Sequence, residues 1–117
     1  MLRLNVNNET SRLRAVVLGI GNSMGLVPTA NECYDPKSRF HILNGTYPME
    51  IDIIPQLDSL NKVFLKYNIK VFRPSILKNY NQIFSRDIGF VIGNKFFISN
   101  TIEERSNEIK GLNSLFK

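Results

Sequence analysis

The sequence predicts a mixed α/β fold. Segments with β character alternate with segments of helical periodicity along a chain of 117 residues. Apolar residues make up 43% of the chain and charged residues 21%, which suffices for a packed core and is unlike disordered or collagen-like sequence. Because domains commonly hold about 100–200 residues, the length fits one domain or part of a larger one.

The first predicted element is a short strand. Residues 13–20 (LRAVVLGI) form an apolar run with a glycine, Gly19, just before its last residue. This pattern favours a buried strand. Three prolines and three glycines then interrupt residues 21–48. We therefore expect residues 21–48 to form one long loop without a helix, and loops of that length often carry function.

Residues 52–67 predict an amphipathic helix followed by a strand. Because proline fits only the first turn of a helix, Pro55 places the helix start near Asp52, and Asn68 ends the helix. Residues 69–74 then predict a strand closed by a proline. The apolar residues that define the helix recur at intervals of four and three: Ile53, Leu57, Leu60, Phe64 and Tyr67.

A β-hairpin is the next element. Two apolar runs, residues 88–92 and 95–98, are joined by the dipeptide Gly93-Asn94. This dipeptide suits the two-residue turn that connects antiparallel strands.

The last predicted element is a helix. Thr101 and Glu104 match a capping box, in which each side chain satisfies a backbone amide of the other residue. We therefore expect a helix that begins at Ile102 and stops at Gly111.

Charge and cysteine content narrow the class of protein. Fifteen Lys and Arg residues against ten Asp and Glu give a net charge of +5, but the basic residues are scattered from Arg3 to Lys117. This pattern is typical of a solvated surface rather than a nucleic-acid interface. With Cys33 as its only cysteine and no long apolar segment, the chain is predicted to be cytoplasmic, with no membrane partner and no disulfide.

Three residues conflict with the pattern around them. Arg105 shares a helical face with apolar residues, so it should pair with a carboxylate, await an anionic ligand, or extend its charged group to solvent. Asp87 immediately precedes an apolar strand and should project near the rim of the sheet; the alternatives are an acid in a surface turn or a pair with Arg86. Asn81 lies six residues before Asp87, where an amide is also typical of a turn.

The sequence around these residues resembles the guanidino-group-modifying enzymes, a superfamily of arginine deiminases, dimethylarginine hydrolases and amidinotransferases. The pattern is an Asn, an Arg-Asp pair six residues later, a hairpin, and a helix with Arg-x-x-Glu. Here it is carried by NQIFSRD (81–87) and IEERSNE (102–108). Residues 6–18 (VNNETSRLRAVVL) are also similar to the first strand of that family, and the helix that leads into residues 71–74 (VFRP) resembles the family as well.

The resemblance implies a role for each of the three residues. The acid that corresponds to Asp87 grips a substrate guanidinium through paired hydrogen bonds, which suit a planar, forked cation. The residue that matches Asn81 adds a polar contact to the same substrate. The residue that matches Arg105 neutralises the substrate α-carboxylate in deiminase-type members.

Catalysis in this superfamily needs a cysteine nucleophile and a proton-shuttling histidine, both far downstream of the Arg-Asp pair. Cys33 and His41, the only residues of their types, precede Asp87 and match neither position. They are eight residues apart, a spacing that matches no recognised zinc pattern. The alternatives are a nucleophile with its base or, with Glu32 and Asp35, a metal site, but we interpret both as ordinary loop residues. We expect no metal and no cofactor.

The resemblance also implies an architecture. The complete family fold is a pentein, an α/β-propeller of five ββαβ-type units, of which residues 1–117 would supply about the first two. The chain is thus expected to be an N-terminal fragment that binds an arginine-like guanidine, lacks turnover by itself, and self-associates or needs a C-terminal remainder. The alternative is a small, basic, non-enzymatic module that binds an acidic partner.

Overall fold

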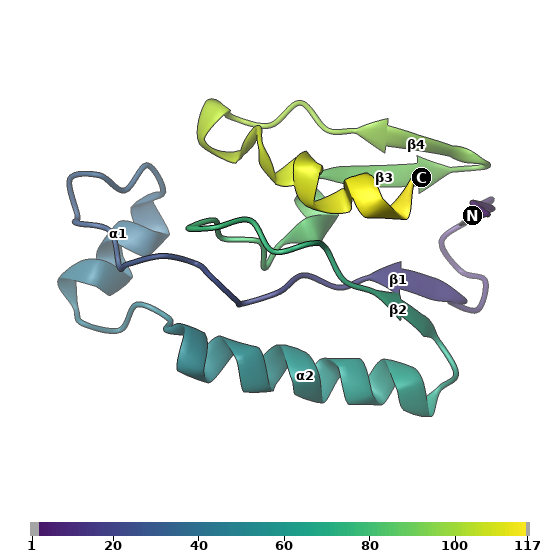
Figure 1. Cartoon of the computed structure of the whole chain (residues 1–117), viewed down its shortest axis with the longest axis horizontal. Helices are drawn as coiled ribbons and strands as arrows, with labels where there is room; N and C mark the ends of the chain where they lie inside the picture. The colour runs from purple at the N-terminus through teal and green to yellow at the C-terminus, as the bar shows by residue number, and fades with distance from the viewer. Residues whose placement is uncertain (1–2, 117) are drawn as a thin grey trace.

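The computed structural model describes residues 3–116 and confirms the mixed α/β prediction. Its strands form two separate two-stranded sheets, and within the described residues no sheet closes into a barrel or a propeller. Figure 1 shows three layers: α2 (Glu50–Lys66) along one side, the pair β1–β2 in the middle, and the hairpin β3–β4 on the other side.

The middle layer is a parallel pair of short strands. β1 (Ala15–Val17) runs alongside β2 (Lys70–Phe72), with Val16 opposite Val71. The strand predicted over 13–20 is therefore real but shorter. The chain nevertheless stays extended beyond β1, because the Leu18 N–H donates to the Phe72 carbonyl at 2.9 Å.

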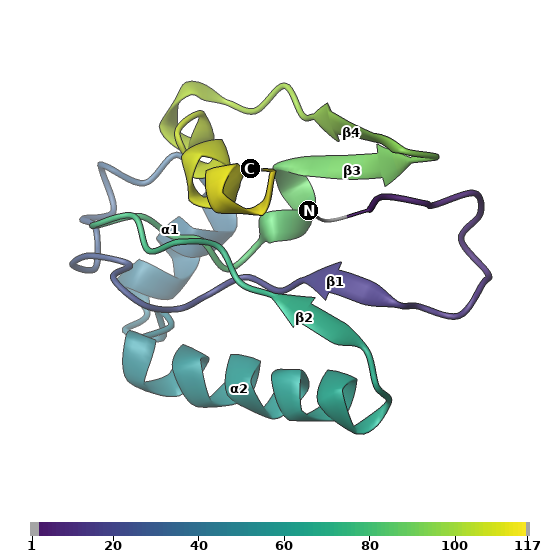
Figure 2. The same ribbon diagram turned by 45° about the vertical axis from the view of Figure 1, so that its right-hand side comes forward.

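Helix α2 covers one face of this pair (Figure 2), but it starts earlier than predicted. It begins at Glu50 instead of near Asp52, so Pro55 lies in the second turn and leaves the Ile51 carbonyl without an N–H four residues on. The predicted end is confirmed, since Asn68 takes the left-handed conformation (φ +56°) that terminates helices.

The prediction of a loop without a helix over 21–48 is wrong. Helix α1 (Pro36–Leu43) forms within it, at the left end of the molecule in Figure 1. The Asp35 carboxylate caps this helix, accepting from the Ser38 N–H at 2.8 Å and from the Ser38 hydroxyl at 2.7 Å. Pro36 occupies the first helical position, where its missing N–H costs nothing, so this proline starts a helix rather than preventing one.

The hairpin prediction is confirmed. β3 (Gly89–Ile92) pairs antiparallel with β4 (Lys95–Ile98), and Ile92 faces Lys95 across the turn. Gly93 has φ +58°, the value that the first central residue of such a turn requires. The N-terminal segment also joins this turn, since the backbones of Val6 and Gly93 exchange hydrogen bonds of 2.9 and 2.6 Å.

The predicted C-terminal α-helix is replaced by 3₁₀ structure. A 3₁₀ turn spans Glu103–Arg105 and a 3₁₀ helix spans Glu108–Leu115, and no side-chain cap forms at either start. The capping box from Thr101 and the stop at Gly111 are therefore wrong. Gly111 lies inside the 3₁₀ helix, where a Cβ would stand 2.6 Å from the Gln82 amide nitrogen.

Within residues 3–116 no helix is long and apolar enough to cross a membrane.

The core is small and the hairpin is poorly covered. Phe90 and Phe97 stack on the hairpin with ring centroids 5.4 Å apart, yet both stay largely exposed, as do Ile92 and Ile98. The apolar residues that are buried are Leu18, Ile20, Ile53, Ile88 and Leu112.

Candidate functional site

Two cavities, of about 710 and 460 Å³, lie at the end of the molecule opposite the hairpin turn. The larger one extends between the loop after β1, the residues around α1 and the start of α2. The smaller one reaches the 3₁₀ turn before β3 and the residues after β4. Asn81, Asp87 and Arg105 all line the smaller cavity, so the fold brings together the three residues that the sequence singled out.

Asp87 is positioned by a short 3₁₀ turn, Ser85–Asp87, that is anchored to β1. The Ser85 hydroxyl is buried and donates to the Val17 carbonyl at 3.1 Å. Ile88, next along the chain, is also buried. These two residues anchor the turn, and Asp87 at its end borders the smaller cavity.

Asn81 is positioned by its neighbour Gln82, which is almost completely buried. The Gln82 side chain accepts from the Leu77 N–H at 2.8 Å and donates to the Ser75 carbonyl at 2.9 Å. Its backbone carbonyl accepts from the Ile20 N–H at 3.1 Å. Gln82 therefore ties the loop before Asn81 to the extension of β1.

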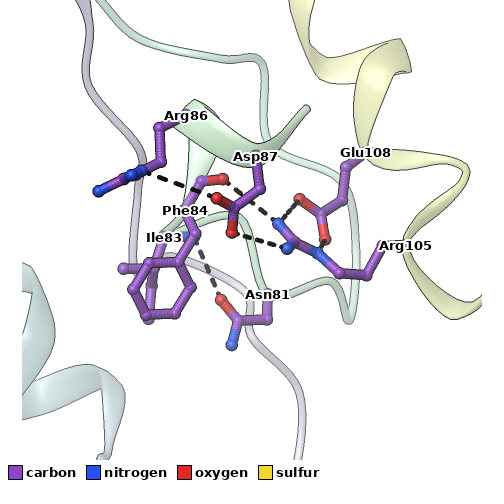
Figure 3. A network of polar contacts seen from close by, with 7 residues as sticks. All are labelled: Asn81, Ile83, Phe84, Arg86, Asp87, Arg105 and Glu108. Carbon is purple, nitrogen blue, oxygen red and sulfur yellow. Dashed lines mark hydrogen bonds and ion pairs between the residues drawn. The ribbon is translucent and has the colours of Figure 1, made fainter. Parts of the chain in front are cut away.

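Arg105 joins two carboxylates (Figure 3). Its Nε and Nη2 donate to the two oxygens of Glu108 at 2.8 and 3.0 Å, and its Nη1 donates to Asp87 Oδ2 at 2.9 Å. Nη2 also donates to the Phe84 carbonyl at 3.3 Å. Of the alternatives that the sequence left open, the structure shows Arg105 paired with carboxylates.

The partner of Arg105 lies three residues further along the chain. Arg105 ends the 3₁₀ turn Glu103–Arg105 and Glu108 begins the 3₁₀ helix Glu108–Leu115, with Ser106 and Asn107 between them in right-handed helical conformation. Glu108 is buried and its hydrogen bond raises the pKa of Arg105 above the ordinary arginine value, against the opposing effect of desolvation. The guanidinium therefore remains charged.

The Asp87 carboxylate keeps capacity for a further partner. One oxygen holds Arg105, while the other lies 3.8 Å from Nε of the exposed Arg86 (Figure 3). A carboxylate has about four lone-pair sites, and that of Asp87 is nearly half exposed to the cavity. Asn81 is exposed as well, and its Oδ1 accepts from the Ile83 N–H at 3.1 Å, as a turn-forming amide does.

The cavities concentrate negative charge in a basic protein. Of the fifteen Lys and Arg residues all but Lys117 are described, and among those Arg105 alone lines either cavity. Six of the ten carboxylates line them: Glu32, Asp35, Glu50, Asp87, Glu104 and Glu108.

Aromatic side chains complete the lining of the larger cavity. Tyr34, Tyr47 and Tyr80 all border it. Burial raises the pKa of Tyr34, with further contributions from nearby carboxylates and an opposing one from Arg105. Burial likewise raises the pKa of Tyr47. Both phenols are therefore neutral near neutral pH, so the tyrosines add uncharged aromatic side chains to the cavity lining.

Cys33 and His41 are not hydrogen-bonded to each other. The Cys33 thiol lies 3.5 Å from the Asp35 carbonyl, and Nδ1 of His41 lies 2.8 Å from the Thr46 hydroxyl. Cys33 borders the larger cavity, whereas His41 borders neither. Residues 3–116 contain no cluster of three or more His, Cys, Asp or Glu side chains able to hold a metal ion.

Sequence reasoning missed several of the lining residues. The signal for Glu108 was present, because Arg-x-x-Glu places the acid three residues after Arg105. The tyrosines carry no local signal, since segments distant in the sequence bring them together. Glu50 is another such residue: its carboxylate accepts from the Met24 N–H at 2.6 Å and so closes the loop after β1 onto α2.

Comparison with known proteins returns no matching family model, curated protein or solved structure. The arrangement of the cavities therefore carries the functional argument. A cavity bordered by carboxylates and tyrosine side chains, with its one arginine already paired, suits a planar organic cation.

Proposed function

We propose that this chain binds a small guanidino compound, as the substrate-binding part of a protein similar to amidinotransferases and arginine deiminases. The observation that supports it is the position of Asp87. This carboxylate borders a cavity and already holds one guanidinium, that of Arg105, at 2.9 Å. The chemistry required of a guanidine site is thus present within the protein itself.

A ligand guanidinium would approach the exposed side of the Asp87 carboxylate. Paired N–H donors match the two oxygens of a carboxylate, and charge-assisted hydrogen bonds of this kind are about twice as strong as neutral ones. The Asn81 amide oxygen, which borders the same cavity, offers a further acceptor. Asp87 and Asn81 are therefore the binding residues, and Arg105 holds the carboxylate in place.

Turnover is assigned to groups outside this chain. A guanidine-modifying reaction of this superfamily requires a thiolate that attacks the guanidinium carbon and a histidine that moves protons. The Cys33 thiol contacts the Asp35 carbonyl and the His41 ring contacts the Thr46 hydroxyl, so the two do not form such a pair with each other. We propose that residues 1–117 bind a guanidine in the cytoplasm without converting it.

The exposed apolar face of the hairpin supports a second part of the proposal. Phe90, Ile92 and Phe97 share one exposed face of a sheet with an open edge, and proteins usually cover such a face. We propose that self-association or a C-terminal remainder covers it and extends the two sheets toward a pentein-like propeller. Sedimentation equilibrium of the chain tests the first arrangement: self-association gives a mass above 13.4 kDa that falls in the Phe97→Ser variant.

A calorimetric titration with butylguanidine tests the binding function. Replacing Asp87 by Asn removes the charge that pairs with the ligand, and we expect affinity to fall by at least about tenfold. Asp58→Asn is the matched control, because Asp58 is also an exposed partner of an arginine, Arg73 at 3.7 Å, but borders neither cavity. Equal affinity of the Asp87→Asn and Asp58→Asn proteins would contradict the proposal.

The distribution of charge favours one second candidate, a basic module for an acidic partner. Outside the cavities basic side chains predominate, since only four carboxylates remain: Glu9, Asp52, Asp58 and Glu103. Binding to DNA or RNA with a steep salt dependence, together with indifference to guanidines, would establish this candidate in place of the first.

A further inference from the structure

The hydrogen bonds of Arg105 restrict what the site accepts. A guanidinium has five N–H groups, and Arg105 uses four of them within the protein: two to Glu108, one to Asp87 and one to Phe84. A ligand carboxylate needs two adjacent N–H groups for paired hydrogen bonds. One such edge of Arg105 faces Glu108, and the other faces Asp87 and the Phe84 carbonyl, so both are occupied.

Glu108 keeps Arg105 in this arrangement. Its carboxylate is buried in the 3₁₀ helix and accepts from Nε and Nη2 of Arg105. If Arg105 turned toward a ligand carboxylate, Glu108 would be left as a buried charge without a partner, which is strongly unfavourable. Glu108 is therefore a positioning residue that holds Arg105 away from the ligand.

The remaining charges of the cavities also oppose a carboxylate. Apart from Arg105, no Lys or Arg among residues 3–116 borders them. Glu32, Glu50 and Glu104 border the larger cavity, as do the side chains of Tyr34 and Tyr80. An ammonium group is attracted by carboxylates and by aromatic faces, whereas a carboxylate is repelled by both.

We infer that the ligand is a guanidino compound without a carboxylate, which carries a second cationic group. Its guanidinium lies against Asp87, and its ammonium lies in the larger cavity among the tyrosines and carboxylates. This inference rests on the proposed guanidine-binding function and specifies the substrate class: a guanidinoalkyl amine rather than an α-amino acid such as arginine.

Calorimetric titrations with four ligands test the inference. Guanidinobutylamine and arginine amide carry two positive charges, butylguanidine carries one, and arginine adds a carboxylate. We expect the two dications to bind at least about tenfold more tightly than arginine, with butylguanidine between them, because both charges of a dication are complemented. This preference should shrink at high salt, as for any partly exposed charge pairing.

A pair of variants locates the second charge. Glu104 borders the larger cavity, whereas the adjacent Glu103 borders neither. Glu104→Gln should reduce the preference for arginine amide over arginine by about threefold, and Glu103→Gln should leave it unchanged. Both substitutions remove one exposed carboxylate, so they share any general effect of net charge.

The outcomes separate this inference from the function on which it rests. Arginine that binds as tightly as arginine amide would overturn the inference while guanidine binding stands. An unchanged preference in Glu104→Gln would overturn the placement of the ammonium. If none of the four guanidines binds, or if their binding survives Asp87→Asn, the proposed function itself fails.

Discussion

The two ends of one ion-pair network differ in their exposure. The side chain of Glu108 is 3% exposed, that of Arg105 is 19% exposed and that of Asp87 is 44% exposed. Both acids bind the same guanidinium at similar distances, 2.8 and 2.9 Å. The same chemistry therefore holds the C-terminal 3₁₀ helix in place at the buried end and presents an acid to a cavity at the exposed end.

Arg105→Met should have the largest effect on the buried end. It leaves the buried Glu108 carboxylate without its partner, and losing one member of a buried pair costs about 3–5 kcal/mol. Urea denaturation measures this loss. Arg86→Met is the control, because the Arg86 side chain is 89% exposed and its ion pair with Asp87 is long, at 3.8 Å. This substitution should change the free energy of unfolding by less than about 0.5 kcal/mol.

A compensating substitution sharpens the test. Replacing Glu108 as well removes the unpaired charge, so the double variant Arg105→Met, Glu108→Leu should recover much of the lost stability. A double variant as unstable as Arg105→Met alone would show that the stability comes from something other than charge pairing at Glu108.

Gln82→Ala should have an intermediate effect, because it acts on the support of the exposed end. It leaves the Ser75 carbonyl and the Leu77 N–H without their partner, and an unsatisfied buried polar group costs about 1–3 kcal/mol. Urea denaturation with Gln56→Ala, on the exposed side of α2, as the control measures it. Equal stability of the two variants would mean that Gln82 does not hold the loop before Asn81.

Asp87→Asn should have the smallest effect on stability. Asparagine keeps an oxygen for Nη1 of Arg105, and an exposed ion pair contributes at most about 1 kcal/mol. The free energy of unfolding should therefore fall by less than about 1 kcal/mol while guanidine affinity falls. A loss as large as that of Arg105→Met would place Asp87 with the structural end of the network.

The parts of the fold that were predictable depend on local patterns. The periodicity of α2 and the Gly93-Asn94 turn are encoded by neighbouring residues, and both elements form. Helix α1 was missed because counting prolines ignores position, whereas Asp35 and Pro36 together start a helix. The C-terminal segment was misread because the capping bonds expected of Thr101 and Glu104 do not form and the segment takes 3₁₀ structure, with a period of three instead of 3.6.

The candidate site was predictable only in part. The conflict between Arg105 and its apolar neighbours left three arrangements open, and the structure shows one of them, pairing with carboxylates. The roles of Asn81, Asp87 and Arg105 in binding remain predictions. The cavities themselves arise where loops far apart in sequence meet, so no local pattern marked Tyr34 or Glu50 as lining residues.

The most direct test of the guanidine site is an NMR titration of the ¹⁵N-labelled chain with guanidinobutylamine. The amide signals of residues 80–88 and 102–108 should shift together along one binding curve, and those of the hairpin turn around Gly93 should stay in place. Shifts spread evenly over residues near all ten carboxylates, or confined to residues away from Asp87, would contradict the site.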